Sequence, residues 1–451
     1  MPKHAHTVIS LGLMALLIAA GPALGQLTKK DREEEKEKDR KREAAKQAAL
    51  NAPPPPPTEP MSDRVLVLER SKDWTMAVDV RVVAATVQSV VDGQVIEGQV
   101  PFKFSSAALV FPMLTASASH RLEMDSSNVP RYTGELRFNG AVLDATPTFV
   151  EGYAAGTKLA RWEMRDVEGN DAQLHVEYKM TCWNTVFDED LARTIPWPKG
   201  AWPAVAASAL KPQMFIESDD PAIKDLVTRL LNGQDPKAQP PVVVAKHLAG
   251  EVLKMAQPSG DGLVFNKNSS FRGFLLKGAV AMAADGKGSS HDVACLLTAV
   301  YRGAGLPARV VIGYDKEDAQ SGKSGGLIRN SSGPSNLRSW VEFALVDPFD
   351  NKVFWVPVDV VRLRRVSSRP PSFDSPWRFF GTHDELNGVL PLAFGFHPPT
   401  TVTAMSPAFW GWLTTPETGM GEQSLRFTAF RTPQRGDEPS RMNRPAPKGD
   451  R

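Results

Sequence analysis

Apolar and polar residues alternate along much of the stretch from residue 62 to 190, and a period of two is typical of strands with one buried face. One predicted strand places its apolar side chains at Trp74, Met76, Val78, Val80 and Val82. A second places them at Leu174, Val176 and Tyr178. The pairs Asn139-Gly140 and Gly169-Asn170 predict turns between strands. Since long helical periodicity is missing here, we predict an all-β, sandwich-like domain over residues 61–195.

Beyond residue 200 the apolar positions change to helical spacing. Residues 223–231 and 242–255 predict two helices, and a third is predicted to begin at Ser289. Ser289 is a favourable N-cap, and Asp292 three residues later comes close to a capping box. Glycines and a proline after residue 302 end this helix. Ser290 therefore lies in the first turn, with its side chain on the packed face.

Three segments with strand character follow this helix, at residues 309–312, 339–345 and 353–359. Helices followed by such strands predict an α+β second half of the chain. The Gly- and Ser-rich residues 320–335 predict a loop, which we interpret as a candidate flap over a site. We treat residues 371–415 as a C-terminal extension of this core.

The N-terminus carries a targeting pattern. Lys3 precedes an apolar run of 13 residues, and Ala23-Leu24-Gly25 fits a small-x-small cleavage site. The run is short for a membrane span, so an uncleaved anchor is the alternative that we favour less. We predict a signal peptide over residues 1–25 and an exported bacterial protein, periplasmic or extracellular, with no integral membrane span in the mature chain.

The ends of the chain differ in composition from its middle. Residues 26–60 combine a charge run with the five prolines 53–57, which predicts a linker, as a solvated helix or a disordered spacer. Glu37 and Lys41 are spaced for an ion pair on one helical face. Residues 416–451 are rich in Pro, Gly, Arg and Glu, and we predict a disordered tail there.

Global composition narrows the function only slightly. The chain has 451 residues, 42% of them hydrophobic, which predicts two folded units. A net charge of +2 gives no reason to expect a nucleic-acid partner. The eight histidines show no metal-ligand pattern, and we expect no metal and no cofactor. Cys182 and Cys295 are interpreted as free buried thiols, with a disulfide as the alternative.

Four segments together resemble the transglutaminase-like superfamily, whose members share the papain-type fold of cysteine hydrolases and acyltransferases. They are Gly288-Ser289-Ser290-His291-Asp292, residues 305–314 (Gly-Leu-Pro-Ala-Arg-Val-Val-Ile-Gly-Tyr), Arg338-Ser339-Trp340-Val341-Glu342 and Trp355-Val356-Pro357-Val358-Asp359. The resemblance implies a transglutaminase-like domain over residues 200–370, in which a helix packs on an antiparallel sheet. Similar proteins often carry a β domain before this core.

The resemblance also implies a catalytic triad, and this sequence departs from it. The family's cysteine, histidine and aspartate fall on Ser290, Arg338 and Asp359. A serine hydroxyl needs a general base, and arginine stays protonated and cannot supply one. We therefore expect these triad-equivalent positions to be inactive. We also predict an ion pair between Arg338 and Asp359, the alternative being an exposed arginine with no fixed partner.

Three classes of function remain open from the sequence. In the first, a pseudoenzyme binds a peptide, a protein or a cell-envelope polymer, or scaffolds an envelope complex. In the second, Ser290 works with a histidine from elsewhere as an active peptidase, amidase or acyltransferase. His291, His383 and His397 are the candidates for that histidine. In the third, the β domain carries the function and the core is structural.

Overall fold

The protein is described by a computed structural model that covers residues 37, 40–41, 60–151, 154–260, 262–265, 271–316, 336–396, 412–415 and 421–432. The expected signal peptide, the 320–335 loop and His397 lie outside these residues, as does most of the expected linker. Within that linker Glu37 and Lys41 form the predicted ion pair, at 2.8 Å. The described residues from 60 onward belong to one compact unit, where we expected two.

The β-rich region is built around two long antiparallel strands, β1 (Leu66–Ala84) and β10 (Asp171–Phe187). They lie at the centre of an eight-stranded sheet of order β12-β13-β20-β1-β10-β6-β7, with β5 also paired to β10. The other members are β5 (His120–Leu122), β6 (Tyr132–Phe138), β7 (Ala141–Leu143), β12 (Leu263–Phe265), β13 (Phe271–Phe274) and β20 (Gly421–Arg431).

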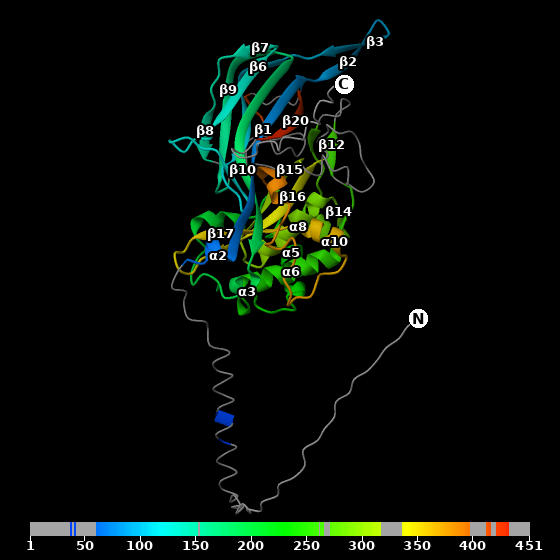
Figure 1. The fold of residues 1–451 in the computed structure, drawn as a ribbon. Helices are drawn as coiled ribbons and strands as arrows, with labels where there is room; N and C mark the ends of the chain where they lie inside the picture. The colour runs from blue at the N-terminus through cyan, green and yellow to red at the C-terminus, as the bar shows by residue number, and fades with distance from the viewer. Residues whose placement is uncertain are drawn as a thin grey trace, which may run out of the picture. The chain divides into compact units, whose positions relative to one another are not determined.

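A second sheet of order β19-β4-β9-β8 faces the first. Its strands are β4 (Phe102–Leu114), β8 (Thr148–Glu151), β9 (Thr157–Gly169) and β19 (Trp412–Thr415). Edge-on contacts join the two sheets, with ring centroids 6.0 Å apart for Phe111 and Tyr178 and 6.2 Å apart for Tyr132 and Trp162. The predicted sandwich-like region is therefore confirmed (Figure 1). The hairpin β2 (Thr86–Val91) and β3 (Gln94–Gln99) extends from it.

The predicted faces of the central strands agree with the structure. The alternating apolar side chains of β1 from Trp74 to Val82 and of β10 from Leu174 to Tyr178 are all buried. Asn139 and Gly140 have positive φ angles of 48° and 82° between β6 and β7. This conformation matches the tight primed turn for which Asn-Gly is preferred.

The prediction of a disordered tail over residues 416–451 is wrong for residues 421–431. They form β20, which pairs with β1 along its length. Leu425, Phe427 and Ala429 are buried against the sheet core. Leu425, Phe427 and Ala429 alternate with polar residues, a strand signal that the prediction from the tail's overall Pro, Gly, Arg and Glu content overlooked. The edge of β1 supplies the backbone partners that order the segment.

The helical part of the chain covers a four-stranded sheet of order β17-β16-β15-β18. These strands are β15 (Ala308–Asp315), β16 (Leu337–Val346), β17 (Val353–Val358) and β18 (Val389–Phe394). The main helices are α5 (Pro221–Leu230), α6 (Pro241–Met255), α7 (Ala279–Asp285), α8 (Ser290–Gly303) and α10 (Val360–Val366). Helix α8 packs on β16, where the rings of Tyr301 and Phe343 lie 5.8 Å apart. The predicted α+β fold class is confirmed.

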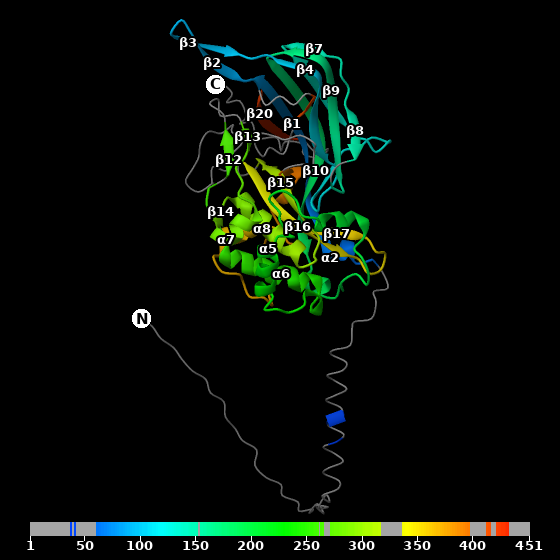
Figure 2. The ribbon, with the colours of Figure 1, turned by 180° about the vertical axis from the view of Figure 1, so that it is seen from behind.

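Short elements complete the chain. They are α2 (Ser62–Val65), α3 (Glu189–Ala192), α4 (Ala204–Ala207), the strands β11 (Gln257–Pro258) and β14 (Lys287–Gly288), and the 3-10 turns η1 (Ser208–Leu210), η2 (Pro236–Ala238) and η3 (Leu386–Gly388). The strands β1 and β10 run from the sandwich into the helical part (Figures 1 and 2). At that end Thr185 of β10 exchanges two backbone hydrogen bonds with His383. This shared backbone explains why the two parts form one unit.

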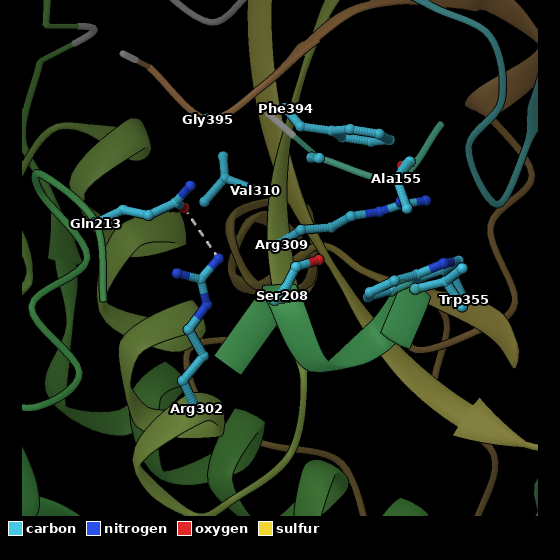
Figure 3. Close-up of a pocket in the computed structure, with 12 residues that line it drawn as sticks. Ala155, Ser208, Gln213, Arg302, Arg309, Val310, Trp355, Phe394 and Gly395 are labelled. Carbon is cyan, nitrogen blue, oxygen red and sulfur yellow. Dashed lines mark hydrogen bonds between the residues drawn. The ribbon is translucent and has the colours of Figure 1, made fainter. Parts of the chain in front are cut away.

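A buried ion pair joins the two parts at Arg309 and Glu342. The guanidinium donates from Nε and Nη2 to Glu342 Oε2, at 2.9 and 2.7 Å, and lies between the rings of Trp355 and Phe394. Two sandwich loops bind the same pair, through Ala118 N–H on Glu342 and the Ala155 carbonyl on Arg309. Figure 3 shows the hollow beside it, which at about 20 Å³ has room for one water.

Replacing Arg309 with methionine leaves Glu342 buried without its cation. We expect the free energy of unfolding to fall by about 3–5 kcal/mol, the usual cost of breaking a buried pair from one side. Urea titration followed by circular dichroism measures it. The exposed pair Lys103–Glu168 supplies the matched control, since Glu168→Gln should change the stability by less than about 1 kcal/mol. Equal effects at the two sites would contradict a special role for the buried pair.

Candidate functional site

Ser290, Arg338 and Asp359 come together at one cavity of about 120 Å³. They come from three elements: the start of α8, the second residue of β16 and the residue that follows β17. The other lining residues are Asp315, Asn336, Leu337, Ser339, Val361, Arg362 and Arg365. The structure therefore brings the three predicted positions to one cavity.

Local hydrogen bonds determine where Ser290 lies. The predicted N-cap Ser289 accepts from the Asp292 backbone N–H at 3.1 Å, and the Asp292 carboxylate accepts from the Ser289 N–H at 2.8 Å. This reciprocal capping box begins helix α8 at Ser290. The Asp292 carboxylate also accepts from the Lys277 N–H at 2.8 Å, which holds the helix start against the preceding loop.

Arg338 forms the predicted ion pair with Asp359. Its Nε donates to Asp359 Oδ2 at 2.8 Å, and its Nη2 lies 2.7 Å from the same oxygen. The Arg362 backbone N–H donates to Asp359 Oδ1 at 2.8 Å, so the carboxylate also caps helix α10. Burial would raise the pKa of Asp359, but Arg338 and the other donors hold it well below its usual range. The carboxylate is thus a fixed anion.

The rest of the guanidinium of Arg338 is also engaged. Its Nη1 donates to Asp315 Oδ2 at 3.3 Å and to Glu385 Oε2 at 3.5 Å. Its Nη2 lies 2.6 Å from Nε2 of His383. Each of the three guanidinium nitrogens therefore faces acceptors within the protein. The side chain of Arg338 is 10% exposed, and its guanidinium holds Asp359, Asp315, Glu385 and His383 together at one side of the cavity.

His383 is the histidine that the structure brings to this group. Its Nε2 faces the guanidinium of Arg338 and its Nδ1 faces the Glu385 backbone N–H at 3.3 Å, so donors meet both ring nitrogens and the imidazole is neutral. Burial and the cation of Arg338 lower the pKa of His383 to about 4, against the opposing effect of Asp359. Its Nε2 lies 3.8 Å from Asp359 Oδ2, with the guanidinium of Arg338 in contact with both. The ring is therefore bound to Arg338 and is held uncharged.

His291 follows Ser290 in sequence but makes its contact elsewhere. Its Nδ1 lies 2.9 Å from Oγ of Ser339, and its ring packs edge-on against Phe274 and Phe396. Burial lowers the pKa of His291 to about 4. Among the described residues its Nε2 has no hydrogen-bond partner. The expectation that adjacent helix residues point in different directions agrees with this placement.

Sequence reasoning missed three charged residues around Arg338: Asp315, Arg362 and Glu385. Arg362 Nη2 donates to Asp315 at 2.8 Å, and its Nε lies 3.3 Å from Glu385. Arg362 belongs to helix α10, which the sequence analysis had not predicted. The signal available in the sequence was Asp359 itself, because an aspartate is a strong N-cap three residues before Arg362.

Several other candidates have no part in this site. Cys182 and Cys295 are both free and buried, as interpreted from the sequence. Burial raises the pKa of both thiols, so neither is a ready source of thiolate. Nε2 of His247 donates to the Leu230 carbonyl at 2.8 Å, a structural contact away from the cavity. Within the described residues no group of His, Cys, Asp and Glu side chains is arranged to hold a metal ion.

Residues 262–360 match the family model of the transglutaminase-like superfamily, so the chain contains a transglutaminase-like domain. None of the curated proteins matches the sequence. A solved structure from Cytophaga hutchinsonii, named "putative cysteine protease", covers 82% of this chain and 93% of its own at 11% identity, with a TM-score of 0.48. A "putative protease" from Parabacteroides distasonis covers 66% and 64% at 10% identity, with a TM-score of 0.19.

The buried histidines predict a loss of stability in mild acid. His383 and His291 have pKa values of about 4 in the folded protein, and in the unfolded chain such groups titrate near about 6.5. Between these values the unfolded state binds more protons, so the free energy of unfolding falls as the pH drops. In His383→Asn the loss between pH 7 and pH 5 should be smaller by about 1–2 kcal/mol.

Urea titrations of both proteins at the two pH values measure this difference. His175→Gln is the matched control, because Asp79 raises the pKa of the half-exposed His175 despite partial burial. That variant should lose at least as much stability as the parent protein, because protonation of a histidine with a raised folded-state pKa stabilises the fold and the variant lacks this gain. An unchanged loss in His383→Asn would mean that His383 does not titrate as its surroundings imply.

Proposed function

We propose that the transglutaminase-like domain of this protein is a pseudoenzyme that binds a polypeptide ligand without acyl transfer. The observation that carries the proposal is the ion pair between Arg338 and Asp359 beside Ser290. At the position where the family has its histidine, a permanent cation occupies the space next to the aspartate. A cation of this kind can neither accept the serine proton nor return one to a leaving group.

The nucleophile position supports the same conclusion. A serine hydroxyl becomes a nucleophile only when a base removes its proton. The two imidazoles near the cavity contact Arg338 and Ser339 rather than Ser290. A positioned general base supplies a rate factor of about 10²–10⁴. Since the thiolate is also missing, the chemistry of a cysteine hydrolase has no counterpart at these residues.

One specific contact favours a second candidate, a serine hydrolase based on Ser339. Ser339 lines the cavity, and its Oγ lies 2.9 Å from Nδ1 of His291, within reach for general-base catalysis. Two features weigh against it. Burial lowers the pKa of His291 to about 4, and within the described residues no acceptor meets Nε2 to stabilise an imidazolium. We therefore place this candidate second.

A serine-reactive fluorophosphonate probe separates the two candidates. We expect no labelling of the folded protein and no peptidase, amidase or glutamine acyl-transfer activity, because neither hydroxyl has a competent base. Mass spectrometry of probe-treated protein gives the readout. Labelling that disappears in Ser290→Ala would overturn the pseudoenzyme, and labelling that disappears only in Ser339→Ala would favour the second candidate.

Restoring the family residues tests the same point in the opposite direction. The double variant Ser290→Cys/Arg338→His should gain acyl-transfer activity, because a thiol and an imidazole would then share the cavity with Asp359. The expected rate is at least about 100-fold above that of the single variant Ser290→Cys, the lower end of general-base effects. Equal rates in the two variants would show that Arg338 does not occupy the proton carrier's position.

We further propose that the chain is exported. The apolar run at residues 8–20 and the small-x-small site at Ala23-Leu24-Gly25 support this. Among the described residues, no helix has the length and apolar composition that a membrane crossing requires. N-terminal sequencing of protein recovered from a bacterial periplasm should begin at Gln26. Recovery of the intact N-terminus from the cytoplasm would contradict export.

A further inference from the structure

The hairpin of β2 and β3 exposes aliphatic side chains on both of its faces. Val87, Val91 and Ile96 share one face and are 44%, 49% and 48% exposed, and Val90 and Val95 lie opposite each other on the second face. Among the described residues the two strands form a sheet of their own, which projects from the sandwich at the end away from the helices (Figures 1 and 2). A two-stranded sheet is at best marginally stable in water, and an apolar face favours the addition of further strands.

The turn of the hairpin determines which backbone groups face outward. The loop is Asp92-Gly93, and both of its residues have positive φ angles, as in the tight primed turn. Across such a loop the flanking residues Val91 and Gln94 exchange backbone hydrogen bonds, and outward and inward residues alternate from there. The backbone groups of Gln88 and Val90 therefore point away from β3, to the outer edge of β2.

The two edges of the hairpin differ in charge. The strand β2 contains no charged residue and no proline. The strand β3 carries Glu97, whose carboxylate accepts a hydrogen bond from the Gln88 amide at 2.7 Å. Edge strands are commonly protected from pairing by charge or proline, and the edge of β2 has neither protection. Two β3 edges would bring Glu97 of each copy to one interface, where like charges destabilise pairing, so β2 is the edge that suits a copy of itself.

We propose that the β2 edges of two copies of this chain pair antiparallel, which gives one continuous sheet of order β3-β2-β2-β3. A two-fold axis at Ser89 places Val87 of each copy opposite Val91 of the other. Ile96 lies opposite Ser89 in the hairpin, so these aliphatic side chains of both copies form one face. The outward backbone groups of β2 supply the hydrogen bonds between the copies. Two-fold pairing of identical surfaces is the commonest arrangement of soluble oligomers.

The size of this interface indicates how strong the association should be. Each copy contributes two six-residue strands, fewer residues than the roughly 20–30 per side of a standard interface. Interfaces that bury less than about 1,200 Å² belong mostly to weak and transient complexes. We therefore expect a monomer–dimer equilibrium that shifts with protein concentration, and not a permanent dimer.

Sedimentation velocity of the full chain over a concentration series measures this equilibrium. Gln88→Pro removes an outward-facing donor from β2 and leaves the bonds to β3 in place, so it should raise the dimer dissociation constant at least about tenfold. Glu97→Pro is the matched control, because it makes the same change at the residue opposite Gln88 and should leave the dimer unchanged. A chain that stays monomeric at every concentration, or a dimer that survives Gln88→Pro, would overturn the proposal.

An introduced cysteine tests the register. The backbone groups of Ser89 face β3, so Ser89→Cys places two thiols in a non-hydrogen-bonded pair, where Cα atoms about 4.5 Å apart permit a disulfide. The native Cys182 and Cys295 are buried and do not compete. Val142→Cys is the control, because Val142 is equally exposed on the β6–β7 hairpin and lies outside the proposed interface.

Under mild oxidation only Ser89→Cys should form a covalent dimer on non-reducing electrophoresis. Equal cross-linking of Ser89→Cys and Val142→Cys, or none in either, would contradict the pairing of β2 edges. The same comparison decides the case in which both proline variants are monomeric, since the cysteine variants keep the hairpin intact.

Discussion

The buried ion pair between Arg309 and Glu342 is the interaction on which the arrangement of the two parts depends. A charge taken out of water is costly unless an opposite charge and further hydrogen bonds surround it. Here the pair is completed by the Ala118 N–H and the Ala155 carbonyl, which come from sandwich loops. The sandwich is therefore needed to satisfy a charge in the core, and β15 and β16 are held in register at the same point.

The pairing of β16 with β15 and β17 also determines where the cavity lies. Arg338 lies four residues before Glu342 on β16 and thus on the same side of the strand, at the end where β17 finishes in Asp359. The Arg309–Glu342 pair and the Arg338–Asp359 pair share one electrostatic feature: the arginine is stabilised by carboxylates rather than by water. The pair at Glu342 connects the sandwich loops to the helical part, and the pair at Asp359 lines the cavity beside Ser290. A charge held in this way suits recognition, since it does not have to move during binding.

Much of the fold could be predicted from local pattern. The alternation around Trp74 and the capping box at Ser289 depend only on residues a few positions apart, so both can be read directly from the sequence. The pairing of β20 with β1 and the contact of His383 with Arg338 could not be predicted in this way. These contacts depend on partners that are distant in the sequence: β20 pairs with β1 near the other end of the described chain, and Arg338 lies 45 positions before His383, so a local pattern does not identify either partner.

The sequence by itself determined much of the strand and helix pattern and the residue types at positions 290 and 338, from which we propose that no proton carrier stands beside Ser290. The physical reason is that an arginine stays protonated in any fold. Only the tertiary structure decided which groups surround that arginine: Asp315, Glu385 and His383 come from separate elements and meet at Arg338 through long-range packing. Distance between charges, unlike their identity, is a property of the folded chain.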